Sequence, residues 1–300
     1  MTDSALSFSS NTPMADPSTV RVAFIGGGNM AQALGKGMLG QQCSAQQMLV
    51  IDPSESAQAA WQSFGVSTQA QPDGALSACN IWFLAVKPQL LADVVAQCRP
   101  YLQANTLVIS VAAGIRALDL SHWLGSAQQP FTRLIRCMPN TPAFVRQGVT
   151  GMLALSGVQA EERARAQQLL ESVGAVVWVD HEQALDAVTA LSGSGPAYVF
   201  LFLESLIAGG VALGLTEAQA QQLALQTVSG AAALAQQATE PIAQLRKNVT
   251  SEGGTTAAAL AVFEQHDFRH LVAQALAAAA QRADELATEF AQPAPPSAAD

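Results

Sequence analysis

Two glycine-rich segments have the residue types and spacing to do chemistry. The first, VAFIGGGNMA, places Gly26 and Gly28 at the first two positions of the pattern G-x-G-x-x-G, with Ala31 at the third. The first glycine permits a tight strand-to-helix turn, the second lets the backbone approach a pyrophosphate, and the small third residue lets the helix pack closely. The N–H groups at the start of that helix, including those of Asn29 and Met30, would face the anion. The segment therefore predicts a dinucleotide site, with a purely structural glycine turn as the alternative.

An acidic residue ends the next apolar run, MLVI at 48–51. Asp52 can accept hydrogen bonds from the ribose of a bound nucleotide, or it can simply end the strand in an Asp-Pro turn. A carboxylate facing the ribose favours NADH because it repels a 2′-phosphate, and no Lys or Arg lies in residues 53–80 to offset it. Ser54 and Ser56 can still donate to a phosphate. Both NADPH and NADH therefore stand as candidate cofactors.

Small or polar residues follow three further apolar runs. Ligands of open α/β sheets bind beyond the carboxyl ends of the strands, so these positions are candidates for cofactor contact. The lysine that follows the run at 81–86 has an alternative role as a solvated cation before a proline-initiated helix. The residues predicted to bind the cofactor at these ends are Val86, Lys87, Pro88, Ala113, Gly114 and Asn140.

The second glycine-rich segment, SEGGTT at 251–256, precedes a helix predicted to start near Thr256. Consecutive N–H groups at a helix start can hold a carboxylate without a cationic side chain, which suits a chain with so few lysines. An ordinary capping turn is the alternative, because Ser, Thr and Gly are common helix caps. The candidate anion-binding residues are Ser251, Gly253, Gly254, Thr255 and Thr256.

The pattern of apolar runs predicts the elements that position these segments. Short, nearly continuous apolar runs alternate with helical stretches up to residue 180, which is typical of a parallel sheet covered on both faces. From about 182 to 289, Ala, Leu and Gln dominate and strand character disappears, which predicts a helical second domain. The stretch 198–213 has little polar face, so a helix there needs cover on every side. We expect a partner subunit to supply it.

Composition excludes several classes of function. Only 12% of the residues are charged, the net charge is -9, and no run of Lys or Arg occurs, so the chain lacks the cationic face of a nucleic-acid binder. No apolar run approaches the ~20 residues needed to span a bilayer. Four scattered cysteines without CxxC spacing indicate buried thiols in a reducing compartment. These features predict a cytoplasmic protein.

Four segments are expected along the chain. Residues 1–18 and 291–300 are rich in Ser, Thr, Pro, Ala and Asp and are predicted to be disordered tails without a signal peptide. Between them, residues 19–181 form the predicted dinucleotide-binding domain and 182–290 the helical domain.

Taken together, the motifs resemble those of the pyrroline-5-carboxylate reductases, and the resemblance covers about 20–290. The matching segments are FIGGGNMA (24–31), AVKP (85–88), VAAG (111–114), IRCMPNTPA (135–143), DAVTALSGSGPAYVF (186–200) and NVTSEGGTTAAAL (248–260). The last of these is the most specific to the family, whereas the first is shared with many dehydrogenases.

The resemblance implies an α/β Rossmann-type N-terminal domain followed by an all-α C-terminal dimerisation domain, with dimers that assemble into larger rings such as homodecamers. It implies reduction of the cyclic imine 1-pyrroline-5-carboxylate to L-proline by hydride transfer from NAD(P)H. It places the substrate carboxylate at 251–256 and makes Thr256 the catalytic candidate that orients the imine nitrogen or relays its proton. One position departs from the family: Glu252 stands where a proline is usual, which predicts a looser loop.

Other interpretations meet obstacles in the sequence. A β-hydroxyacid dehydrogenase needs a catalytic lysine after a glycine-rich turn in the helical domain, whereas Lys247 lies before the turn. A regulatory protein that senses the cofactor without turnover would share the dinucleotide site. An assay that follows nicotinamide absorbance with cofactor and substrate distinguishes such a protein from an enzyme. His266 and His270 have the spacing of HExxH, but residue 267 is Asp and no third ligand is evident, so no metal site is predicted.

Overall fold

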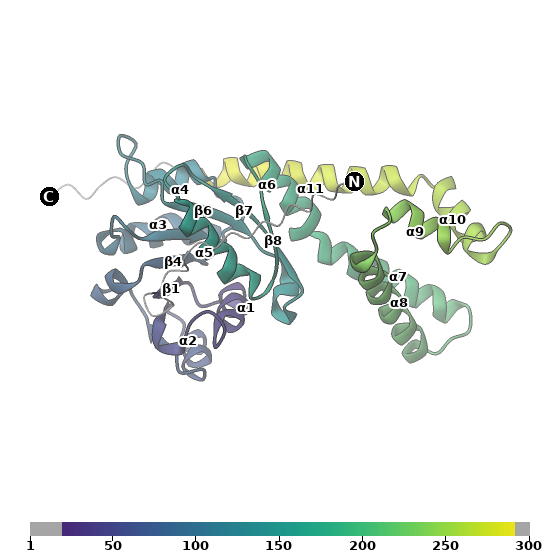
Figure 1. The fold of residues 1–300 in the computed structure, drawn as a ribbon, viewed down its shortest axis with the longest axis horizontal. Helices are drawn as coiled ribbons and strands as arrows, with labels where there is room; N and C mark the ends of the chain where they lie inside the picture. Colours follow the sequence, from purple (N-terminus) through teal and green to yellow (C-terminus); the bar gives the residue numbers. More distant parts are fainter. Residues whose placement is uncertain (1–19, 292–300) are drawn as a thin grey trace, which may run out of the picture.

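The structure, a computed structural model, describes residues 20–291 (Figure 1). The expected tail at 1–18, and all but the first residue of the one at 291–300, lie outside the described residues. An α/β domain with one large sheet is joined to a set of helices that extends away from it. The strands are β1 (Val22–Ile25), β2 (Met48–Ile51), β3 (Ser67–Gln69), β4 (Ile81–Leu84), β5 (Leu107–Ser110), β6 (Leu134–Met138), β7 (Gly148–Ala154) and β8 (Gly174–Trp178).

The sheet has the order β3-β2-β1-β4-β5-β6-β7-β8. Strands β1 to β6 are parallel, as the apolar runs predicted. Strand β7 pairs antiparallel with β6, and β8 runs parallel to β7, so the last two strands reverse the direction of the sheet. The short connection at 139–147 explains the reversal, because a parallel crossover needs a dozen or more residues.

Helices cover both faces of the sheet. Phe24 of β1 packs with Phe83 of β4 and with Trp61 of α2 in a core that also contains residues of α1 and α5. The neighbouring Ile25 faces the opposite core, formed with α3 and α4, because successive strand residues point to opposite sides. These helices are α1 (Asn29–Met38), α2 (Glu55–Gln62), α3 (Pro88–Cys98), α4 (Ala117–Leu124) and α5 (Ala160–Glu171); short 3₁₀ turns lie at Ala45–Gln47, Gly74–Ala78, Arg99–Tyr101 and Thr141–Val145.

The helical part of the chain leaves and then returns to the sheet. Helices α7 and α8 lie side by side away from the sheet, and α11 runs back to it (Figure 1). At its end, Phe290 packs against Gly114 beyond β5. The elements are α6 (Glu182–Val188), the π-helix η6 (Thr189–Gly193), α7 (Gly195–Ala212), α8 (Glu217–Gln237), α9 (Ile242–Asn248), α10 (Thr255–Gln265) and α11 (Phe268–Phe290).

Much of this helical surface is apolar and uncovered in a single chain. Helix α7 contains no buried residue, and Leu201 within it is 65% exposed. Within the described residues, one helical stretch, Glu182–Ala212, has the length and composition to cross a membrane, and only 6% of its most apolar window is buried. Within the described residues, these helices therefore expose apolar surface that the chain itself does not cover, and cover by a partner subunit stays a prediction.

All four cysteines are free and buried, as their scattered positions predicted. Burial raises the pKa of Cys43 to about 11 and that of Cys98 to about 12. Burial likewise raises the pKa of the Cys79 and Cys137 thiols. The cysteines are therefore neutral core residues near pH 7.

A charge network centred on the buried Arg136 joins the sheet to the helices. Arg136 of β6 is almost fully buried and pairs with Glu182 at the start of α6. The other oxygen of Glu182 accepts the N–H of Ala117 at 2.7 Å. Arg116 donates to Asp186 of α6 at 2.8 Å and also pairs with Asp284 of α11. Burial lowers the pKa of Arg136, and the charge of Glu182 opposes that effect.

We expect Glu182→Ala to lower the free energy of unfolding by about 3 kcal/mol, because it leaves the guanidinium of Arg136 buried without its partner. The matched control is Glu171→Ala at the exposed end of α5, where a change of at most about 0.5 kcal/mol is expected. Urea unfolding followed by circular dichroism measures both. Equal stability of the two variants would contradict a structural role for the Arg136–Glu182 pair.

Candidate active site

The glycine loop between β1 and α1 is built as a tight turn. The N–H of Gly26 donates to the carbonyl of Ile51 at 2.8 Å, and its φ is +94°. A Cβ on Gly26 would lie 2.7 Å from the backbone of Ala85, so the position requires glycine. A Cβ on Gly28, in contrast, would meet nothing within 4 Å. Gly26 is therefore needed by the fold, whereas Gly28 leaves open space at the loop.

Two side chains hold the middle of this loop. Asp52 accepts the N–H of Gly27 at 2.7 Å, and the indole of Trp61 donates to the Gly27 carbonyl at 3.0 Å. The other oxygen of Asp52 accepts the N–H of Ser54 at 2.9 Å. The sequence indicated Asp52 but not Trp61, because nothing in its spacing shows that α2 reaches the glycine loop.

The start of α1 offers free hydrogen-bond donors. Gly28 is the N-cap and supplies no side chain, and the first turn carries no acidic residue. The first N–H bonded within this helix is that of Gln32, to the carbonyl of Gly28 at 2.9 Å. The N–H groups of Asn29 and Met30 therefore have no partner within the helix, which suits a pyrophosphate bound at its start.

Other candidate cofactor residues gather at the same edge of the sheet. Strands β1, β4 and β5 pair in register at Ile25, Leu84 and Ser110, so the residues that follow them are neighbours. Val86 and Pro88 are half-buried and Lys87 is exposed at the N-cap of α3. Ala113 and Gly114 follow β5, where Gly114 has a φ of +74°.

Asn140, the candidate beyond β6, already has partners within the chain. Its amide nitrogen donates to the carbonyl of Ser192 at 3.1 Å, and its oxygen accepts the N–H of Val149 at 2.9 Å. These bonds connect the end of β6 to η6, the link into the helical region. A hollow of about 410 Å³ lies beside it, bordered by Pro142 and Tyr198 among others. A contact between Asn140 and the cofactor stays a prediction.

The segment 251–256 forms a turn between α9 and α10. Gly254 donates to the carbonyl of Ser251 at 3.1 Å, and Gly253 adopts a φ of +67°. Gly254 is the N-cap of α10, whose first turn has no acidic residue. The first intrahelical bond comes from Ala258, so the N–H groups of the preceding residues are open to an anion. Helix α10 begins at Thr255, one residue before the predicted start.

Two side chains of this turn bear on its chemistry. Thr256 is half-buried, and its hydroxyl makes no hydrogen bond within the described residues. Glu252 is exposed at the tip of the turn, and the bond from Gly254 to Ser251 closes the turn even though Glu252 replaces the usual proline. The hydroxyl of Thr256 therefore remains available to a ligand.

The two glycine-rich segments lie far apart in a single chain. Figure 1 shows α9 and α10 at the right-hand end of the long axis, and α1 and α2 in the opposite half. The candidate residues thus form two half-sites, one at the edge of the sheet and one at the start of α10. Within the described residues, no group of three or more His, Cys, Asp or Glu could hold a metal ion.

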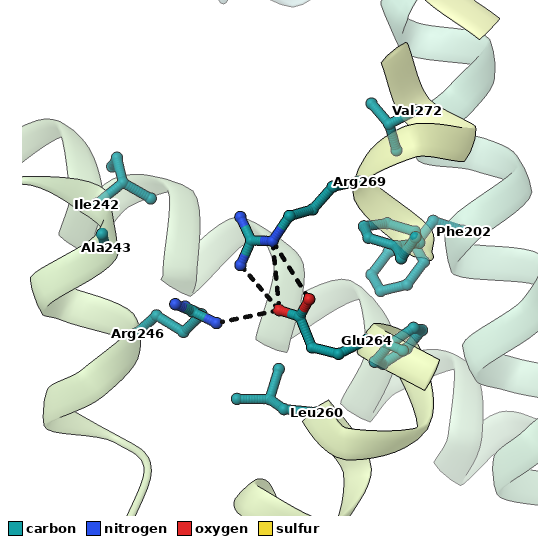
Figure 2. Close-up of a pocket in the computed structure, with 10 residues that line it drawn as sticks. Phe202, Ile242, Ala243, Arg246, Leu260, Glu264, Arg269 and Val272 are labelled. Carbon is teal, nitrogen blue, oxygen red and sulfur yellow. Dashed lines mark hydrogen bonds and ion pairs between the residues drawn. The ribbon is translucent and has the colours of Figure 1, made fainter. Parts of the chain in front are cut away.

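A large cavity lies in the helical region and is lined in part by α9 and α10, the helices that flank the 251–256 turn. It has a volume of about 680 Å³ and lies between α7, α9, α10 and α11 (Figure 2). Apolar side chains such as Phe202 and Leu260 line it, and Glu264 reaches both Arg246 and Arg269 across it. These ion pairs connect the two helices that flank the 251–256 turn to the start of α11.

The sheet and its glycine loop define a dinucleotide-binding protein of the Rossmann type. Two family profiles match the chain: "NADP oxidoreductase coenzyme F420-dependent" over residues 21–114 and "Pyrroline-5-carboxylate reductase dimerisation" over residues 182–286. The pyrroline-5-carboxylate reductase of Pseudomonas aeruginosa is 42% identical over 92% of this chain and 100% of its own length. That of Pisum sativum is 41% identical over 88% of this chain and 95% of its own. The chain belongs to the pyrroline-5-carboxylate reductase family.

Solved structures agree with this assignment. The pyrroline-5-carboxylate reductase of Coxiella burnetii superposes with a TM-score of 0.83 at 37% identity, covering 89% of this chain and 98% of that one. The Plasmodium falciparum pyrroline carboxylate reductase, solved with NADP bound, has a TM-score of 0.78 at 29% identity with the same coverage. The predicted fold class, a Rossmann-type domain followed by a helical dimerisation domain, is confirmed.

Proposed function

We propose that this enzyme reduces 1-pyrroline-5-carboxylate to L-proline with NADPH or NADH, as the last step of proline biosynthesis. The nicotinamide supplies a hydride to the carbon of the C=N bond, and the ring nitrogen ends with a proton. The observation that carries the proposal is the pair of half-sites, each with unbonded N–H groups at a helix start. One suits a pyrophosphate and the other suits the substrate carboxylate.

The first half-site holds and orients the cofactor. The open space at Gly28 and the free N–H groups of α1 receive the pyrophosphate, and Asp52 receives the adenosine ribose. The residues beyond β4, β5 and β6 then border the nicotinamide end, and the small size of Ala113 allows close approach, whereas Gly114 gives room to Phe290 of α11. This assignment follows from the shared edge of the sheet.

The second half-site binds the substrate. The N–H groups that follow Gly253 hold the carboxylate, and no cationic side chain is required. The hydroxyl of Thr256 is unbonded in the described chain, so it can orient the ring nitrogen or relay its proton. Glu252 is exposed to solvent, which screens its charge.

A second copy of the chain brings the half-sites together. The uncovered apolar helices need a partner, and the dimerisation profile over 182–286 supports an identical one. A second copy also explains why Glu182–Ala212 is so apolar without a bilayer. We propose a cytoplasmic homodimer, consistent with its neutral buried thiols. Native mass spectrometry tests the larger ring, with ten copies as the expected assembly.

The decisive experiment follows nicotinamide absorbance with purified protein and 1-pyrroline-5-carboxylate. Consumption of NADPH or NADH that depends on the imine is expected, together with no oxidation of β-hydroxyacids. Hydroxyacid oxidation would instead favour the dehydrogenase alternative, although Lys247 sits in the last turn of α9, before the loop. Cofactor binding without turnover would favour a regulatory protein.

A further inference from the structure

We infer that the ribose end of the cofactor site selects NADH over NADPH. The two cofactors differ only in a 2′-phosphate on the adenosine ribose, so the selection depends on the charges at the end of β2 and the start of α2. The reaction that the selected cofactor serves is the one given under the proposed function, on which this selection rests. Binding of the two cofactors can be compared without the reaction.

Asp52 is fixed where the ribose hydroxyls would lie. Its two oxygens accept the N–H groups of Gly27 at 2.7 Å and Ser54 at 2.9 Å, so the carboxylate cannot turn away without breaking the glycine loop. Each oxygen can still accept a second hydrogen bond, which a ribose hydroxyl can supply. A 2′-phosphate has no proton to give and would meet a negative charge instead.

The first turn of α2 adds to this negative field. Glu55 is exposed there and offsets the partial positive charge of the helix start, which would otherwise attract a phosphate. The hydroxyls of Ser54 and Ser56 bond to each other at 2.9 Å, and Ser54 also caps the N–H of Ala57. These neutral hydroxyls do not offset the negative charges of Asp52 and Glu55.

Among the residues that the structure describes, no Lys or Arg near the end of β2 and the start of α2 offsets these negative charges. Residues 53–80 contain no Lys or Arg. Arg21 lies at the amino end of β1, the opposite edge of the sheet, and the ammonium of Lys36 sits over the ring of Phe64, 4.8 Å from its centre. Lys87 follows β4, which is separated from β2 by β1.

The test measures the dissociation constants of NADH and NADPH for the full-length protein by nicotinamide fluorescence. NADH is expected to bind at least about tenfold more tightly, and the ratio should shrink as salt rises from about 0.05 M to about 0.5 M, because the repulsion is electrostatic. Steady-state kcat/KM values should show the same order. Equal or tighter binding of NADPH overturns the inference.

Reversing the charge at residue 55 tests whether Glu55 contributes to the preference for NADH. Glu55→Lys is expected to tighten NADPH binding by about tenfold and so to narrow the preference. The control is Glu161→Lys, which makes the same change in the exposed first turn of α5 and lies with Asn80 and Ile81 at the amino edge of the sheet. An unchanged NADPH affinity in Glu55→Lys, or an equal gain in the control, contradicts the inference. A protein that binds NADH selectively but leaves the imine unreduced would refute only the proposed function.

Discussion

Replacing Gly28 by valine is expected to weaken cofactor binding severely while the protein stays folded. The backbone at Gly28 has a φ of -69°, which any residue adopts, and a Cβ there meets nothing within 4 Å. The added side chain fills the space assigned to the pyrophosphate and blocks the N–H groups of α1. Loss of two such charge-assisted hydrogen bonds raises the dissociation constant by roughly 100-fold or more. Fluorescence titration measures it, and the melting temperature should change by no more than about 2 °C.

Gly26→Val is the contrasting variant in the same loop. Its Cβ would lie 2.7 Å from the backbone of Ala85 at a φ of +94°, so a loss of stability of about 3 kcal/mol or more is expected. If Gly28→Val binds the cofactor normally, the pyrophosphate does not lie beside Gly28. If both variants unfold alike, the distinction between a structural and a binding glycine fails.

Thr256→Ala is expected to lower kcat by about 100-fold and to leave cofactor affinity unchanged. The residue is half-buried at the start of α10, and its hydroxyl has no partner in the described chain, so its removal breaks no bond of the fold. A group that orients the imine nitrogen acts on the transition state, and kcat should therefore fall more than KM rises.

Thr256→Ser keeps the hydroxyl and should retain activity within a few-fold. Thr255→Ala, at the exposed neighbouring position, keeps the backbone donors and is the second control. Steady-state kinetics at saturating cofactor compare all three variants. Wild-type kcat in Thr256→Ala would remove Thr256 from the mechanism and leave the backbone of the turn as the only contribution of this segment.

The sequence predicted the elements well where local signals are strong. Apolar runs located β1, β2, β4, β5 and β6, and Gly26 and Gly28 marked the turn that follows β1. Helix α10 begins at Thr255, one residue from its predicted start, because Gly254 ends the turn unambiguously. The reversal at β7 was not foreseen, since the direction of a strand depends on its partner and on the length of the connection.

Contacts between distant segments could not be predicted. Trp61 holds Gly27 from a helix 34 positions along the chain, and nothing in its local sequence marks that role. Arg116 and Glu182 belong to a network that exists only because α6 and α11 return to the sheet. The partners of Asn140, Ser192 and Val149, were also not apparent, although the asparagine itself was singled out.

The central claim is that one site forms from the glycine loop of one subunit and the 251–256 turn of its partner. Co-expression of Gly28→Val and Thr256→Ala in equal amounts tests it directly, because each variant alone has at most about 1% of wild-type activity. If the site is shared between subunits, random pairing leaves about a quarter of the sites with both segments intact, and about a quarter of wild-type activity returns. Activity that stays at the level of the single variants would show that each chain supplies both segments of its own site.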